Sequence, residues 1–288
     1  MKRILVLGST GMLGHQVFFK LDSNPEYQVF DLSFRNKLRE ETIICDVTDF
    51  NRLEQVVKEI KPDFIVNCIG ILIKGSNDNP KNSILINAYL PHFLVNVAEE
   101  IGSRVIHIST DCVFSGKKGS YLESDFRDAD DVYGRGKALG EIFSKKHLTL
   151  RTSIIGPELK QNGEGLFHWF MSQTNGVNGF TQAWWGGVTT IELAKVIEES
   201  IQKELSGLYH ISNEESISKF ELLNLFNAEF KRGLKINPIE GKQVDKSLKT
   251  EFPGMLHSIP SYPQMIHEMK NFMVSHKNLY SLQYPDVG

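Results

Sequence analysis

The chain has 288 residues, of which 41% are hydrophobic, so it can bury the core of one large α/β domain with a smaller appendage, or of two modest domains. Its 32 lysine and arginine residues and 35 aspartate and glutamate residues give a net charge of -3, which offers no electrostatic reason to expect nucleic acid as a partner. Three scattered cysteines indicate neither a disulfide framework nor a structural zinc site and suit a reducing compartment. The first apolar stretch is too short for a signal peptide or a membrane span, so we expect a cytoplasmic protein that binds no membrane, no nucleic acid and no metal.

The chain begins with a predicted strand, a glycine turn and a helix. Residues 3–7 are a continuous aliphatic run apart from Arg3, typical of a strand buried on both faces of a parallel sheet. Gly8, Gly11 and Gly14 follow at the spacing G-x-x-G-x-x-G, and the apolar-periodic run 16–21 predicts the helix. Such glycines allow a tight turn and a close approach of a pyrophosphate to the helix N-terminus, which stabilises anions. Three glycines are often only a turn, so this prediction depends on the motifs that follow.

Residues 27–33 predict the second strand, and the residue at its end indicates which nicotinamide cofactor fits. An acid at that point binds the ribose hydroxyls of NAD, whereas a nearby arginine favours the 2′-phosphate of NADP. Ser33 falls at the strand end, with Arg35 just beyond it and Asp31 two residues earlier. This balance favours NADP(H), with NAD(H) left open. The alternative is that Arg35 is a solvated loop charge.

Strands and helices then alternate at a regular rhythm. Further strands are predicted over residues 43–47, 64–67, 104–108 and 148–151. Helices are predicted over residues 50–60, over residues 79–97 with a kink near Asn87 caused by Pro91, and from residue 132 as far as Phe143. The rhythm predicts right-handed crossovers and an α/β fold with a doubly wound Rossmann parallel sheet. Its ligand loops lie at the carboxyl ends of the strands, where the sequence has Gly8, Ser33, Asp46, Gly70, Thr110 and Ile154.

Beyond residue 156 the rhythm changes. The sequence predicts a helix over 166–171, loop or short strand over 180–187, a helix opened by a Thr189 and Glu192 capping box, a strand over 208–211 and a helix over 218–230. The tail over 234–288 is predicted to be irregular. We expect residues 1–155 to form an NAD(P)-binding Rossmann domain. Residues 156–288 should form mainly a small α-rich substrate-binding cap, with some segments returning to the first domain.

Tyr133 and Lys137 lie four residues apart on a predicted helix, so their side chains share a face. A phenol with a pKa of about 10 is a poor acid at neutral pH, but an adjacent ammonium lowers that pKa. The pair would then act as a general acid, and the hydroxyl of Thr110 would bond the same carbonyl oxygen of a substrate. The Y-x-x-x-K spacing alone is common by chance. Together with the glycine turn and the strand end at Thr110, it predicts a catalytic group.

These motifs resemble the extended short-chain dehydrogenases/reductases, and most closely the dTDP-4-dehydrorhamnose reductase group of nucleotide-sugar reductases. The resemblance spans roughly residues 1–215 and is carried by residues 8–14, 45–49, 67–70, 86–91, 109–116, 133–141, 150–153 and 193–194. It implies hydride transfer from NAD(P)H to the C4 keto group of a 4-keto-6-deoxy nucleotide sugar. Such a reaction would serve the synthesis of cell-surface polysaccharide or glycan precursors.

The resemblance also implies a role for each matching residue. Tyr133 would donate the proton, Lys137 would hold the nicotinamide ribose and tune Tyr133, and Thr110 would position the keto oxygen. The cofactor-binding residues would be Gly8, Thr10, Gly11, Met12, Leu13, Arg35, Asp46 and Val47 (at the adenine), Cys68, Ile69, Gly70, Tyr133, Lys137 and Ile154. The substrate-binding residues would be Cys112, Val113, His168, Trp184 and Trp185. The expected partner is a nucleotide-sugar substrate, and a homodimer is left open.

The chain departs from the family at Cys112, where an aromatic residue is usual. Related sugar dehydratases have a glutamate there, so dehydration is disfavoured. GDP-fucose synthase has a cysteine at the corresponding place, so one alternative is a reductase that also epimerises. The other is that Cys112 is only a small buried apolar residue. Trp184 and Trp185 differ from the family's usual segment, which leaves the sugar open. A further alternative is a non-catalytic, cofactor-binding regulatory subunit or redox-sensing protein.

Overall fold

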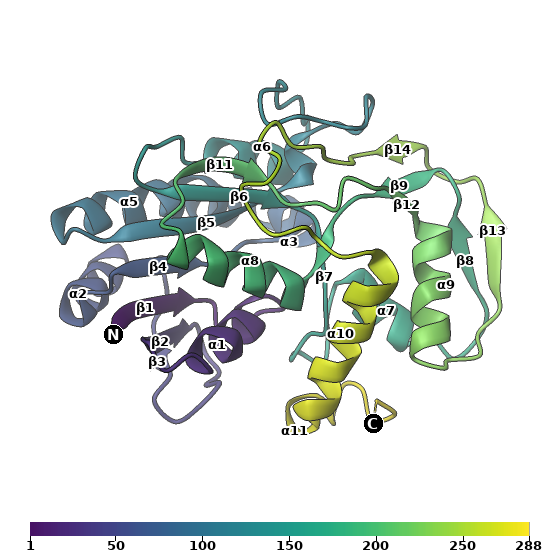
Figure 1. The fold of residues 1–288 in the computed structure, drawn as a ribbon, viewed down its shortest axis with the longest axis horizontal. Coiled ribbons are helices and arrows are strands. Elements are labelled where there is room, and N and C mark those ends of the chain that lie inside the picture. The colour runs from purple at the N-terminus through teal and green to yellow at the C-terminus, as the bar shows by residue number, and fades with distance from the viewer. Residues whose placement is uncertain (288) are drawn as a thin grey trace. The chain divides into compact units, whose positions relative to one another are not determined.

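The computed structural model describes residues 1–287, which divide into two compact units (Figure 1). Unit 1 comprises Met1–Ser115, Phe126–Arg151 and Ala194–Tyr209. Unit 2 comprises Gly116–Asp125, Thr152–Leu193 and residues 210–287. Each unit is therefore assembled from several segments of the chain.

Unit 1 is built on a seven-stranded sheet with the strand order β11-β6-β5-β4-β1-β2-β3. The strands are β1 (Lys2–Leu7), β2 (Tyr27–Ser33), β3 (Ile43–Ile44), β4 (Phe64–Asn67), β5 (Arg104–Thr110), β6 (Leu148–Thr152) and β11 (Gly207–His210). β1 pairs in parallel with both β2 and β4, and the chain order reverses between β1 and β4. This reversal is the switch point of a doubly wound sheet, where ligands bind beyond the carboxyl ends of the strands. The predicted Rossmann fold is confirmed.

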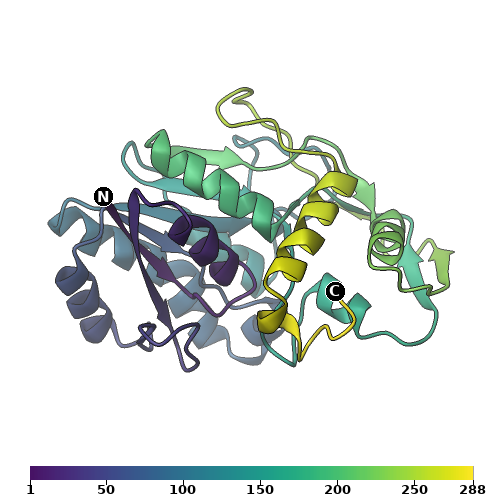
Figure 2. The same ribbon diagram turned by 60° about the horizontal axis from the view of Figure 1, so that its bottom comes forward.

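Helices cover both faces of this sheet (Figures 1 and 2). The helices are α1 (Gly14–Asp22), α2 (Phe50–Ile60), α3 (Ile73–Asp78), α4 (Pro80–Ser83), α5 (Leu90–Glu100), α6 (Val132–Leu139) and α8 (Thr190–Gln202), with a 3-10 turn η2 (Asp111–Val113). α1 and α8 are joined by an ion pair of 2.6 Å between Lys20 and Glu198. α2 and α5 pack on the opposite face. Alternate side chains of β1 point to the two faces, and both faces are covered, so Ile4 to Leu7 are all apolar and fully buried.

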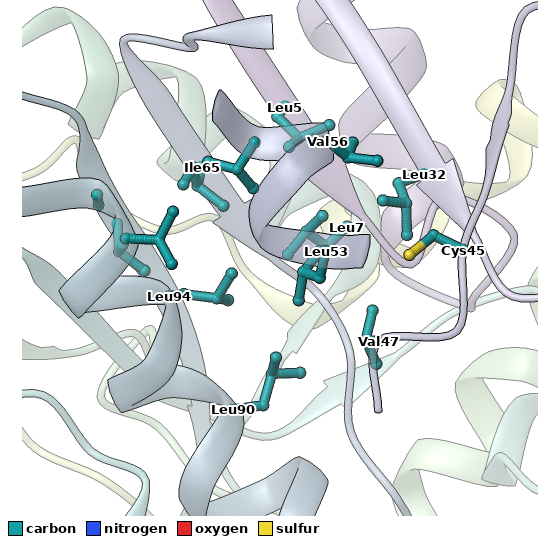
Figure 3. Close-up of a cluster of buried hydrophobic side chains, with 14 of the residues drawn as sticks. Leu5, Leu7, Leu32, Cys45, Val47, Leu53, Val56, Ile65, Leu90 and Leu94 are labelled. Atoms are coloured by element: carbon teal, nitrogen blue, oxygen red, sulfur yellow. The ribbon is translucent and has the colours of Figure 1, made fainter. Parts of the chain in front are cut away.

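The main core of unit 1 lies between the sheet and the helices α2 and α5 (Figure 3). Leu5 and Leu7 of β1 and Ile65 of β4 meet Leu53 of α2 and Leu94 of α5, and all five are fully buried. Burial of a leucine or isoleucine side chain contributes about 1.5–3 kcal/mol. This core fixes the sheet whose strand ends carry the candidate site.

The predicted helix over residues 79–97 is interrupted, as expected near Asn87. It consists of α4, a π-helical segment (Ile84–Tyr89) and α5. Pro91 has no N–H to donate to the Asn87 carbonyl, and the chain adapts through the wider π turn. The Asn87 side chain bonds both the N–H and the carbonyl oxygen of Ile71, each at 2.9 Å. The irregular segment therefore supports the loop that follows β4.

Two predicted elements in unit 1 are wrong in extent. The strand predicted over residues 43–47 contracts to β3 at Ile43–Ile44. The helix predicted from residue 132 to include Phe143 ends at Leu139. At Gly140 a Cβ atom would lie 2.0 Å from the Asn87 carbonyl oxygen, so the chain leaves the helix where it packs against the π segment.

Unit 2 combines helices with short sheets. Its elements are α7 (Leu166–Met171), α9 (Lys219–Glu229), α10 (Tyr262–Ser275), α11 (Lys277–Tyr280), and the strand groups β7 (Ile154–Ile155) with β10 (Val188–Thr189), β8 (Val177–Phe180) with β13 (Ile236–Ile239), and β9 (Ala183–Trp185) with β12 (Ile217–Ser218) and β14 (Val244–Asp245). The expectation of an irregular tail is wrong, because the tail contains β13, β14 and the 14-residue helix α10. Pro263 falls in the first turn of α10, where proline starts a helix rather than breaking it.

Candidate active site

A tight glycine turn joins β1 to α1 in unit 1. Gly8 has a φ of 82°, a conformation that residues with side chains rarely adopt. A Cβ atom on Gly14 would lie 2.1 Å from the Gly8 carbonyl oxygen, so α1 can begin this close to the turn only with glycine there. The N–H of Gly11 donates to the same oxygen at 2.9 Å. The glycine spacing therefore produces a compact stretch of bare backbone.

The N-terminus of α1 has the features of an anion site. Its N-cap residue, Leu13, provides no side-chain cap, and the first turn holds no acidic residue. Backbone N–H groups and the helix dipole favour a negative charge at such an end. Thr10 and Met12 lie in the turn that leads into it. The turn therefore fits the pyrophosphate of a dinucleotide.

The loop after β4 lies against the glycine turn. A Cβ atom on Gly8 would lie 2.9 Å from Cγ1 of Ile69. Gly70 is exposed, and the nearest atom to a Cβ built on it is Oδ1 of Asn87 at 3.5 Å. Burial raises the pKa of the Cys68 thiol to about 12, so this group stays protonated. The structure thus brings the two expected cofactor loops together at the switch point.

The end of β2 presents an arginine, whereas the acid of that strand is already paired. Asp31 is buried and accepts a hydrogen bond from Nε of Arg39 at 2.9 Å. The Ser33 hydroxyl donates to a carbonyl oxygen in its own loop. Arg35 is exposed, and its guanidinium lies 4.4 Å from the centre of the Phe34 ring. A cation is therefore exposed at the strand end while the carboxylate is engaged elsewhere.

Three other expected contact residues differ in exposure. Asp46 is exposed, and its carboxylate accepts hydrogen bonds from the N–H and the hydroxyl of Thr48 at 2.9 and 2.7 Å. Val47 is buried in the core cluster of unit 1. Val113 is fully buried as well. The side chains of both valines therefore fill the interior.

Helix α6 holds Tyr133 beside the end of β5. Asp131 caps this helix by accepting a hydrogen bond from the Gly134 N–H at 2.9 Å. A Cβ atom on Gly134 would lie 2.3 Å from the Cys112 carbonyl oxygen, so α6 packs directly on η2. The Thr110 hydroxyl lies near enough to the Tyr133 phenol to lower its pKa. Two members of the expected catalytic group are therefore neighbours, with Cys112 next to them.

The expected electrostatic effect on Tyr133 is wrong for this structure. Burial raises the pKa of the phenol, the charges of Cys112 and Asp111 raise it further, and only the hydrogen bond with Thr110 opposes them. Lys137 is not among the groups that dominate this pKa. The phenol therefore keeps its proton well above neutral pH.

Lys137 is nearly fully buried and is bound on the strand side of α6. Its Nζ donates to the carbonyl oxygen of Ile108 at 2.6 Å and lies 3.4 Å from Nε2 of His107. Burial lowers the pKa of this amine to about 8, against the opposing charge of Glu141. Lys137 therefore changes its charge close to neutral pH.

Ile154 and His168 belong to unit 2. Ile154 lies in β7 and pairs in parallel with Val188. Nδ1 of His168 lies 2.9 Å from the hydroxyl of Tyr284. The structure thus accounts for the partners of both residues within unit 2.

Trp184 and Trp185 also belong to unit 2, and their environments differ. Trp185 is 6% exposed, donates a hydrogen bond from Nε1 to the Ser153 hydroxyl at 2.9 Å and packs against Tyr262. Trp184 is 39% exposed. Of the two, Trp184 is the one with an accessible ring.

The sequence analysis misses the two buried polar residues behind Lys137. Asn67 and His107 face each other on β4 and β5, and both are fully buried. The signal is a polar residue inside an otherwise aliphatic strand, because buried polar groups need specific partners. Among residues 1–287, no group of three or more histidine, cysteine, aspartate or glutamate side chains could hold a metal ion. Over the same residues, no helix is long and apolar enough to cross a membrane.

Comparison with known proteins gives consistent matches. The chain is 26% identical over 234 residues to the dTDP-4-dehydrorhamnose reductase of Aggregatibacter actinomycetemcomitans, covering 77% of this chain and 76% of that protein. It is 26% identical over 241 residues to the methionine adenosyltransferase 2 subunit beta of Danio rerio, covering 77% and 72%. Its fold is similar to the structure of the Bacillus anthracis dTDP-4-dehydrorhamnose reductase in complex with NADP, with 23% identity, a TM-score of 0.79, and coverage of 93% of this chain and 98% of that one.

The fold, the glycine turn and the Thr110, Tyr133 and Lys137 group together define an extended short-chain dehydrogenase/reductase, a class of nicotinamide-dependent oxidoreductases. The family model described as the RmlD substrate binding domain matches residues 1–253. The chain belongs to this family.

Proposed function

We propose that this protein reduces the C4 keto group of a 4-keto-6-deoxy nucleotide sugar with NADPH. The observation that carries the proposal is the placement of the Thr110 hydroxyl, at the end of β5, next to the Tyr133 phenol on α6. The two groups form a donor pair for one carbonyl oxygen, with Lys137 one helical turn away from Tyr133. The similarity to a dTDP-4-dehydrorhamnose reductase over 77% of the chain supports the substrate class.

In this proposal, residues of unit 1 hold the cofactor. Gly8, Gly11 and Leu13 offer bare backbone and a helix N-terminus to the pyrophosphate, and Cys68 to Gly70 line it with backbone. Arg35 binds the 2′-phosphate, since the competing acid of β2 is engaged with Arg39. When bound, the reduced nicotinamide supplies the hydride.

Tyr133 acts as the general acid. Its raised pKa keeps the phenol protonated at neutral pH, so it has a proton to give to the oxygen of the reduced carbonyl. Thr110 orients that oxygen through its hydroxyl, which donates to Oδ1 of Asp111 at 3.0 Å in the free protein and turns to the keto oxygen when substrate is bound. Lys137 carries a positive charge below about pH 8 and, one helical turn from Tyr133, holds the nicotinamide ribose when the cofactor is bound.

Replacing Tyr133 tests the proposal. Tyr133→Phe should keep the fold and NADPH binding but lower turnover by roughly 10²–10⁴, the usual contribution of a positioned general acid. Tyr89, which is half exposed on the π-helical segment, provides the control, and Tyr89→Phe should retain full turnover. Turnover of Tyr133→Phe close to that of the unmutated protein contradicts the assignment. The assay follows NADPH oxidation with 4-keto-6-deoxy sugars carrying dTDP, GDP, UDP or CDP.

The same assay separates the enzyme from a regulatory subunit. The match to a methionine adenosyltransferase beta subunit supports this alternative as a class. Tight NADPH binding without oxidation by any of the sugars would favour the regulatory subunit and overturn the reductase.

A second candidate function, reduction coupled to epimerisation, rests on Cys112. Its thiolate form would raise the pKa of Tyr133, so the Cys112 side chain lies close to the reacting groups. Epimerisation beside a keto group exchanges a carbon-bound hydrogen with solvent, and simple reduction does not. In deuterated water with unlabelled NADPH, we expect no deuterium at C3 or C5 of the product, and Cys112→Ala should retain most activity. Deuterium at either carbon, lost in Cys112→Ala, would establish the epimerase-reductase.

A further inference from the structure

A chain of buried hydrogen-bonding groups runs behind Lys137. Asn67 of β4 and His107 of β5 are register partners on adjacent strands, and both are completely buried. Nδ2 of Asn67 lies 3.2 Å from Nδ1 of His107, and Nε2 of His107 lies 3.4 Å from Nζ of Lys137. The three side chains therefore form one continuous line from β4 through β5 to α6.

The backbone sets the direction of this chain. The N–H of Ile69 donates to Oδ1 of Asn67 at 3.2 Å, which orients the amide so that its NH₂ group faces His107. Nδ1 of His107 must then accept a hydrogen bond. Burial lowers the pKa of His107 well below its ordinary value, and the charges of Lys137 and His92 add to this effect, so the ring is neutral. Its one proton is therefore on Nε2.

The proton on Nε2 points toward Lys137. An ammonium group has three donors and no acceptor, so an ammonium at this distance would oppose the N–H of the ring. A neutral amine has a lone pair that accepts the hydrogen bond, while its own N–H donates to the Ile108 carbonyl oxygen. The hydrogen bond from the Ile69 N–H thus sets the donor and acceptor roles of Asn67, of His107 and finally of the Lys137 amine.

We propose that Asn67 and His107 are positioning residues that hold Lys137 against the Ile108 carbonyl and favour its neutral form in the free protein. The lowered pKa of Lys137, about 8, agrees with this arrangement, and Glu141 is the neighbouring charge that opposes it. The role of the amine in catalysis rests on the proposed function. The hydrogen-bond direction does not depend on that function, because it is a property of the free protein.

The tautomer of His107 is the direct test. Nitrogen-15 NMR of protein labelled at histidine, with His107 assigned by its loss in His107→Gln, should show an unprotonated Nδ1 and a protonated Nε2 at about pH 9, above the pKa of Lys137. A proton on Nδ1, or a doubly protonated ring, overturns the inference. Asn67→Asp provides a second variant, because a carboxylate can only accept and should move the proton to Nδ1.

The titration of Lys137 is the second readout. In His107→Gln the amide oxygen can accept from an ammonium, so the pKa of Lys137, followed by carbon-13 NMR of its side chain, should rise by roughly one pH unit or more. His267 is exposed on α10, and His267→Gln should leave this titration unchanged. An unchanged titration in both His107→Gln and Asn67→Asp contradicts the inference. Both NMR results test the hydrogen-bond direction even if the protein reduced no nucleotide sugar. A wrong tautomer in an active reductase would refute this inference and leave the proposed function intact.

Discussion

Two buried polar networks in unit 1 both draw residues from β5 and from the segment 137–141. One of them compensates a buried charge fully, and the other does not. In the first, Glu141 accepts hydrogen bonds from Ser109 at 2.7 Å, from Arg151 at 2.8 Å with both carboxylate oxygens, and from Arg127 at 3.0 Å. In the second, Lys137 meets one carbonyl oxygen and a neutral imidazole. β5 contributes to both networks, and Lys137 and Glu141 are only four residues apart.

The difference separates a structural charge from a reactive one. A buried charge is costly unless ion pairing and hydrogen bonds compensate it fully. Glu141 and Arg151 compensate each other, and Arg151 also lies over the Phe114 ring. Lys137 has no carboxylate partner of this kind, so its ammonium group loses a proton more readily in the folded protein than in water. A group in that state suits proton chemistry, because its charge can change at little cost near neutral pH.

The largest predicted effect is on the compensated network. Glu141→Gln leaves the fully buried guanidinium of Arg151 without a carboxylate and should lower the free energy of unfolding by about 3–5 kcal/mol. Urea denaturation followed by circular dichroism measures it. Glu54→Gln is the control, since Glu54 forms a partly solvent-exposed pair with Lys58 on α2, and the substitution should barely change the denaturation midpoint. A small effect of Glu141→Gln would remove the distinction between the two networks.

A second prediction extends the comparison to two arginines near the end of β2. Arg39 is paired with buried Asp31, whereas Arg35 only stacks on Phe34. The unmutated protein should bind NADPH more tightly than NADH by about 1.5–3 kcal/mol, the range for hydrogen bonds to charged groups. Arg35→Ala should erase this preference, as measured by calorimetry. Arg39→Ala should lower the free energy of unfolding but retain the preference for NADPH. Equal affinities for both cofactors in the unmutated protein would make Arg35 a surface charge.

The smallest predicted effect is on the uncompensated amine. The folded-state pKa of Lys137, about 8, lies below the ordinary value of 10.5, so the unfolded chain holds a proton that the folded chain lacks between these values. The free energy of unfolding should therefore rise with pH across that window. Lys137→Met removes the buried ammonium and should be about 1 kcal/mol more stable at pH 7, with the difference shrinking as pH rises through the window.

The exposed Lys242 provides the control for this titration. Lys242→Met should keep the rise of stability with pH that Lys137→Met loses. Equal pH dependence of the unmutated protein and Lys137→Met would show that burial of the Lys137 ammonium does not lower the free energy of unfolding.

The regular half of unit 1 is predictable from the sequence because each element carries its own local signal. The helix over 50–60 has one apolar face and Asp49 as its N-cap, and the structure reproduces it residue for residue. The glycine spacing predicts the turn at Gly8 for the same reason, since only glycine tolerates that backbone. The tail is the opposite case, where Pro263 suggests disruption but starts α10.

Features that depend on distant pairing are not predictable in this way. The segment 116–125 looks like a loop of unit 1, yet Tyr121 exchanges backbone hydrogen bonds with Ser247 and Lys249 and joins unit 2. By our inference, the His107 tautomer depends on an amide of the adjacent strand, at Asn67, which lies 40 residues earlier in the chain. In the sequence His107 is only one polar residue within an aliphatic strand. The pKa of Tyr133 likewise depends on its burial, which the spacing of residues in the sequence does not reveal.

Isotope transfer tests the central claim most directly. The protein is incubated with NADPH that carries deuterium at the transferable position of the nicotinamide and with a 4-keto-6-deoxy nucleotide sugar, in ordinary water. Reduction by hydride transfer with proton donation from Tyr133 predicts a product with a single deuterium atom, bound to C4 of the sugar, and no such product from Tyr133→Phe within the same time. A product formed without deuterium at C4, or equal transfer by the unmutated protein and Tyr133→Phe, would contradict the account.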